Sequence, residues 1–115
     1  KDREYTAFLY NKDELKPWRN IQDVDLVLYD AWDTSILPIE SLQTGKRIVT
    51  FRAPGIWKIN TWDSRYYVEH APDALDAPGE WYLDRARGLL SYIPLPGESP
   101  TTATVIAPLL IRPLR

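Results

Sequence analysis

The chain has 115 residues, a length that suits one domain. Apolar residues make up 44% and charged residues 26%, and the net charge is −2, which disfavours both intrinsic disorder and a basic nucleic-acid-binding surface. The chain has no cysteine and a single histidine, His70, which excludes disulfides, thiolate metal sites and multi-histidine metal sites. No apolar run approaches the roughly 18 residues that cross a bilayer. We expect no cofactor, no nucleic acid and no membrane.

The composition favours strands over helices. Five Trp and seven Tyr are strand-favouring residues, and ten Pro interrupt long helices. The first strand is predicted over residues 4–10, followed by a helical turn at residues 18–21 with Trp18 as a buried anchor. Along residues 24–32 successive side chains alternate well between the two faces of a strand. Both faces carry apolar or aromatic residues, which is typical of a central strand.

Proline and glycine divide the segments that follow. Residues 35–42 predict a strand containing Pro38, and because proline cannot donate to a central ladder, we place this strand at an edge or at a bulge. Further strands are predicted over residues 47–52 and 65–69, separated by a Pro/Gly loop. Pro72 and Asp73 favour a helical turn just after the second of them.

A β-hairpin is the clearest prediction in the second half of the chain. Pro78-Gly79 turns the chain into a strand over residues 80–84, and Trp81 is expected to present its ring to the core. Gly88 supplies the positive φ that the loop needs.

The hairpin returns over residues 89–93, which places Tyr92 across from the first strand. A last apolar segment covers residues 104–111. The whole pattern predicts an all-β fold: a small antiparallel β-sandwich or barrel of about seven to eight short strands with one or two helical turns.

Residues 76–98 carry a specific motif. They read Asp-Ala-Pro-Gly-Glu-Trp-Tyr-Leu-Asp-Arg, then Ala-Arg-Gly, then Leu-Leu-Ser-Tyr-Ile-Pro-Leu-Pro-Gly-Glu. This stretch resembles an inserted or accessory β-sandwich-like region of bacterial right-handed parallel β-helix proteins, some of which are β-xylosidase-like or fucosidase-like glycoside hydrolases. The residues that carry the resemblance are Pro78, Gly79, Glu80, Trp81, Tyr82, Asp84, Gly88 and Tyr92.

The resemblance implies that residues 1–115 form a single accessory domain of a larger, extracellular or periplasmic β-helix protein. Its partner would be the β-helix domain of that parent protein. The motif contains no nucleophile, base or metal ligand arranged for chemistry, so no catalytic residue carries over. His70 stands where a carboxamide is common in the family.

Tryptophan supplies the candidate binding residues. Trp57, Trp62 and Trp32 are candidates for stacking on sugar rings, since a flat apolar ring matches a pyranose C–H face. Trp57 and Trp62 lie in the Pro/Gly loop, where binding residues collect. The competing interpretation is that these rings pack in the core or against another domain.

Three pairs of carboxylates are candidates for a glycosidase pair, which needs a separation of about 5–10 Å. Glu80 and Asp84 would lie on one strand face but about 13 Å apart. The other two pairs are Asp30 with Asp33 and Asp23 with Asp25. A calcium site built from the turn carboxylates of Asp30, Asp33 and Asp63 is a further candidate, and solvated or turn-forming roles are the competing interpretation for all of them.

We therefore predict a non-catalytic accessory domain that packs on the β-helix of a secreted carbohydrate-active protein and contributes to polysaccharide binding. The alternatives are a purely structural interaction domain without a ligand and a self-sufficient glycosidase. The first alternative requires buried Trp57 and Trp62, and the second requires two acids close together in a cleft.

Overall fold

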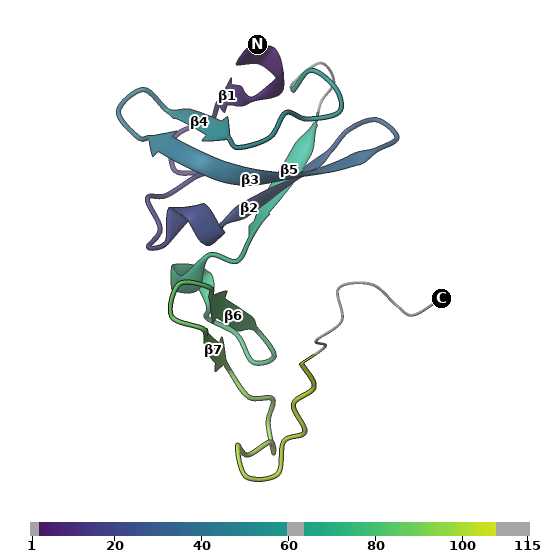
Figure 1. The fold of residues 1–115 in the computed structure, drawn as a ribbon. Coiled ribbons are helices and arrows are strands. Elements are labelled where there is room, and N and C mark those ends of the chain that lie inside the picture. The colour runs from purple at the N-terminus through teal and green to yellow at the C-terminus, as the bar shows by residue number, and fades with distance from the viewer. Residues whose placement is uncertain (1–2, 60–63, 108–115) are drawn as a thin grey trace.

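The structure, a computed structural model, describes residues 3–59 and 64–107. This part contains seven β-strands and three single turns of 3-10 helix, which confirms the predicted all-β class. The strands form a curled five-stranded sheet and, below it in Figure 1, a separate two-stranded hairpin.

The five-stranded sheet is entirely antiparallel, in the order β1-β4-β3-β2-β5. As predicted, β2 is a central strand, between β3 and β5. The sheet curls because the long strand β3 pairs with β2 through its first half and with β4 through its second half. The strands are β1 (Ala7–Leu9), β2 (Asp25–Tyr29), β3 (Thr34–Gln43), β4 (Ile48–Phe51) and β5 (Arg65–Glu69).

Pro38 lies where β3 changes partner. It is the last β3 residue paired with β2, opposite Asp25, and the register against β4 shifts between Ile39 and Ser41. Of the two predicted settings for this proline, an edge or a bulge, the structure has the bulge, since β3 lies inside the sheet. The ladder continues around the proline, because the Pro38 carbonyl accepts the Arg52 N–H at 2.9 Å and the next N–H, that of Ile39, donates to the Val24 carbonyl at 3.0 Å.

The core lies on the inner face of the curl. Trp18, the predicted anchor, is half-buried and packs against this core. Val27 is also buried but does not belong to the core cluster, because it points to the opposite, outer face of β2. The largest fully buried side chains are Leu26, Leu37, Ile39, Val24 and Val49.

The hairpin consists of β6 (Trp81–Asp84) and β7 (Leu89–Tyr92) and follows the turn η3 (Pro72–Ala74). Gly79 and Gly88 both have positive φ, and Tyr92 pairs with Trp81, as predicted. The prediction that Trp81 reaches the core is wrong: its side chain is 53% exposed, whereas the next residue, Tyr82, is 5% exposed.

The physical reason is the two-residue period of the strand, which gives the hairpin one face toward the sheet and one toward solvent. The inward face carries Tyr82 and Asp84, which bond to residues around the turn η2 (Ile21–Asp23). The other face of the hairpin, which carries aromatic and leucine side chains, points away from the sheet. The hairpin is therefore an arm, and the radius of gyration of 16.7 Å exceeds the roughly 13 Å of a compact chain of this length.

The remaining differences concern the ends of elements. Residues predicted to begin the first strand form the turn η1 (Arg3–Tyr5), and the turn predicted at residues 18–21 forms at η2. Residues 104–107 form no strand, and residues 108–111 of that predicted segment lie outside the described residues. Within the described ranges, no helix has the length and apolar character to cross a membrane.

Candidate functional site

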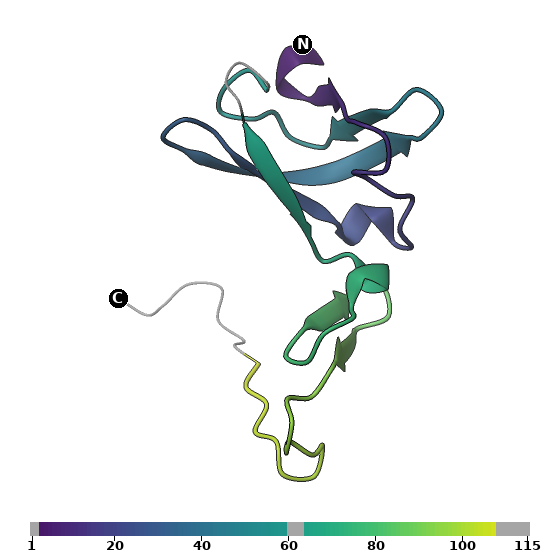
Figure 2. The same ribbon diagram turned by 180° about the vertical axis from the view of Figure 1, so that it is seen from behind.

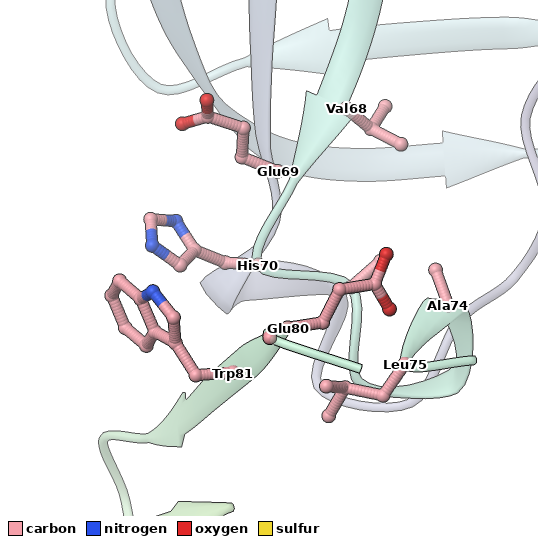
Figure 3. A pocket seen from close by; sticks show the side chains of 9 residues that line it. Val68, Glu69, His70, Ala74, Leu75, Glu80 and Trp81 are labelled. Carbon is pink, nitrogen blue, oxygen red and sulfur yellow. The ribbon is translucent and has the colours of Figure 1, made fainter. Parts of the chain in front are cut away.

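An open pocket of about 370 Å³ lies where the hairpin meets the end of β5. Figures 1 and 2 show the chain leaving β5, forming the η3 turn and entering β6 at this junction. Figure 3 shows the pocket from close by. It is lined by Val68, Glu69, His70, Ala71, Ala74, Leu75, Gly79, Glu80 and Trp81.

His70 occupies the bend between the sheet and the hairpin. Its backbone has φ 59°, a left-handed conformation that a non-glycine residue adopts only at a cost. Its Nδ1 lies 3.2 Å from Oδ2 of Asp25 on the neighbouring strand β2, and both side chains are largely buried. The imidazole meets the Trp81 indole edge-on, with ring centroids 5.5 Å apart. The sheet thereby fixes the position of His70, and His70 supports the tryptophan.

Glu69 extends the site onto the outer face of the sheet. It is the last residue of β5, and its Oε1 accepts a hydrogen bond from the Tyr67 hydroxyl at 3.0 Å. This bond is the main cause that raises the pKa of Tyr67 to about 12. The phenol is protonated at neutral pH and donates its one proton to Glu69, which leaves its oxygen as an acceptor.

Glu80 closes the other side of the pocket. Its Oε2 accepts the backbone N–H groups of Asp76 at 2.8 Å and Ala77 at 3.1 Å. These two bonds hold the pKa of Glu80 below its ordinary value, so the carboxylate stays charged. Figure 3 shows the Glu69 and Glu80 carboxylates directed toward opposite sides of the pocket.

The combination of groups suits a neutral polyhydroxylated ligand. The Trp81 ring offers an exposed apolar surface, and the carboxylates of Glu69 and Glu80 are hydrogen-bond acceptors for hydroxyl groups. Among the described residues that line the pocket there is no lysine or arginine. The described chain also contains no group of three or more side chains placed to hold a metal ion.

Two of the three predicted tryptophans, Trp57 and Trp32, lie elsewhere. Trp57 is 48% exposed, in a loop whose backbone bonds to residues 4 and 5 beside the β1 edge, opposite the β5 edge that borders the pocket. Trp32 is 74% exposed in the β2–β3 connection. Trp62 lies outside the described residues. The structure does not bring Trp57 and Trp32 to the pocket.

The carboxylate pairs separate into individual structural roles. Asp23 accepts the Tyr82 hydroxyl at 2.7 Å, whereas Asp25 faces His70. Asp84 accepts the Arg87 N–H at 3.0 Å and shapes the hairpin loop. The Asp33 carboxylate accepts its neighbour's N–H in the β2–β3 turn. Asp63, the third ligand considered for calcium, lies outside the described residues.

Sequence reasoning missed the pocket because its parts come from three segments. Glu69 ends a strand, His70 follows it, and Trp81 begins the hairpin eleven residues further along. The one available signal was the alternation of Trp81, Tyr82 and Leu83, which requires the tryptophan and the tyrosine to point to opposite faces. Comparison with protein-family models, curated proteins and solved structures gave no match to this chain.

Proposed function

We propose that this chain is a non-catalytic accessory domain that binds polysaccharide at the pocket between β5 and the hairpin. The observation that carries the proposal is the half-exposed Trp81 ring, held by His70 in an open pocket that Glu69 and Glu80 also line. Sugar rings present a C–H face to an aromatic ring and hydroxyl groups to acceptors. The residues that line the pocket supply both kinds of group.

The motif of residues 76–98 supports placement of this domain on a parent β-helix protein. The loop end of the hairpin exposes leucines on both strands, at Leu83, Leu89 and Leu90. Exposed apolar groups of this kind are typical of surfaces that contact another domain. In this proposal the loop end packs on the β-helix of a secreted carbohydrate-active protein, and Trp81 forms part of the wall of the cleft.

The non-catalytic part of the proposal rests on the two pocket carboxylates. Hydrolysis of a glycoside requires an acid with a raised pKa facing a second carboxylate across the scissile bond. Glu80 has a lowered pKa and is held by two backbone N–H groups, and its carboxylate is directed away from that of Glu69. Neither feature suits a self-sufficient glycosidase.

A structural domain without a ligand is the second candidate, favoured by the same exposed leucines, although its requirement for a buried Trp57 is not met, since Trp57 is 48% exposed. The two candidates differ in titration calorimetry of the whole chain with xylo-, fuco- and pectic oligosaccharides. Binding that is lost in Trp81→Ala and kept in Trp57→Ala is the expected result, since both tryptophans are about half exposed but only Trp81 lines the pocket.

Absence of binding to every oligosaccharide would leave the structural candidate in place. Equal losses in the two variants would show that the pocket is not the site. Release of the phenol from aryl glycosides by the whole chain, abolished in Glu80→Gln, would overturn the non-catalytic part of the proposal.

A further inference from the structure

We infer that the pocket is one end of an extended binding strip, which continues over the outer face of β5 and β2 and accepts an internal segment of a neutral glycan. The inference rests on the proposed function and adds to it the ligand's length and charge. The strip comprises Tyr29, Tyr67, Glu69, His70 and Trp81.

The pairing register places the two tyrosines on one face. Tyr67 lies opposite Val27, and Tyr29 lies two residues further along β2 on the same side. Their rings have centroids 5.8 Å apart and are inclined by 35°, and each side chain is 43% exposed. Val27, directly opposite Tyr67, is buried, so the rings form the surface at this point.

Glu69 connects the tyrosine pair to the pocket. It lies two residues after Tyr67 on β5, about 7 Å along the same face, and accepts the Tyr67 hydroxyl. Glu69 also lines the pocket, next to His70 and Trp81. Apolar rings thus lie on both sides of a hydrogen-bonding carboxylate. A ligand that contacts both sets of rings must be longer than one sugar unit.

The charges along the strip define the ligand further. Glu69 and Glu80 line the pocket, and Asp25 lies behind His70. Arg65 is a basic residue on this face, and it lies opposite Tyr29 at the end away from the pocket. Like charges repel in a partly desolvated site, so a uronic acid unit at Trp81 is disfavoured relative to a neutral unit.

The experiment measures affinity against ligand length. Neutral oligosaccharides of one to six units are titrated into the whole chain, and the same lengths of oligogalacturonide serve as the charged series. We expect the affinity for neutral ligands to rise with length up to about four units and each uronate ligand to bind at least about tenfold more weakly.

Variants locate the two halves of the strip. Tyr67→Ala is expected to weaken binding of the longest neutral ligand about tenfold and to leave the affinity for the shortest ligand that binds unchanged. Tyr67→Phe keeps the ring and should retain most of the affinity. Trp81→Ala should weaken all lengths. Circular dichroism and the melting temperature verify that each variant folds.

The outcomes separate the two proposals. Failure of every ligand to bind overturns the proposed function. Binding that requires Trp81 but is independent of ligand length and unaffected by Tyr67→Ala keeps the proposed function and overturns the strip. Tighter binding of the uronates would overturn the assignment of a neutral ligand.

Discussion

The five-stranded sheet and the β6–β7 hairpin are both antiparallel and aromatic-rich, but different interactions hold them in place. The sheet encloses a continuous apolar core from β2, β3 and β4. The hairpin attaches to that body through polar groups, chiefly the Tyr82 hydroxyl, which donates to Asp23 and accepts from Asn20 at 2.8 Å. An ion pair between Arg19 and Asp73 at 2.7 Å fixes the η3 turn beside it.

This difference means that the residues that stabilise the fold and the residues that form the pocket lie largely in different parts of the molecule. Burial of apolar groups stabilises the sheet whatever lies on its outer face. A two-stranded hairpin is at most marginally stable alone, so its orientation depends on a few directional bonds. The pocket lies at the boundary between the sheet and the hairpin. The position of Trp81 therefore depends both on the apolar core of the sheet and on the directional bonds of the hairpin.

The largest expected effect is in the core. Ile39→Ala should lower the free energy of unfolding by about 2–5 kcal/mol, because the side chain is fully buried and its removal leaves a cavity. Leu90→Ala, in the exposed face of the hairpin, should cost less than about 1 kcal/mol. Urea denaturation of both variants measures the difference. Equal costs would contradict the distinction between core and arm.

The anchor of the hairpin should be the next largest contributor. Tyr82→Phe removes the hydroxyl between Asp23 and Asn20 and should destabilise the hairpin by about 1–3 kcal/mol. Hydrogen exchange should accelerate in β6 and β7 and stay unchanged in β2 and β3. Tyr92→Phe is the control, because its hydroxyl donates to the exposed Glu98 at 2.7 Å and not to the residues around η2. Faster exchange throughout the sheet would show that the two regions unfold together.

The turn before β6 should be destabilised by the addition of a single methyl group. Gly79 has φ +92°, and a Cβ there would lie 3.2 Å from Cδ2 of Leu95, so Gly79→Ala should cost about 1–2 kcal/mol. Gly45→Ala meets no atom within 4 Å and serves as the matched control. Thermal unfolding compares them. A neutral Gly79→Ala would mean that the turn adjusts freely and does not set the direction of β6.

The smallest expected effect is a loosening of this turn in acid. The pKa of Glu80 is lowered from the ordinary 4.5 by its two backbone bonds, so its contribution is complete above pH 4.5 and is lost as the pH falls through the lower folded-state value. The amide resonances of Asp76 and Ala77 should shift over that acidic range. Glu80→Gln should abolish the dependence, and a shift that persists in this variant would assign it to another group.

Strand positions followed closely from the sequence where the period was clear. The range 65–69 matches β5, and residues 24–32 contain the central strand β2. The prediction for Trp81 was wrong because it rested on the size of the aromatic ring and not on the alternation of side chains along the strand. In the structure Tyr82, the more polar ring, is buried, because Asn20 and Asp23 satisfy its hydroxyl.

The sequence by itself determined the all-β class and the turns at Pro78-Gly79 and Gly88, because these depend on local backbone preferences and a two-residue period. The tertiary structure alone decided which face of the hairpin is buried and that Glu69, His70 and Trp81 share one pocket. Those facts depend on contacts between residues far apart in the chain, such as Asp25 with His70, which no local pattern encodes.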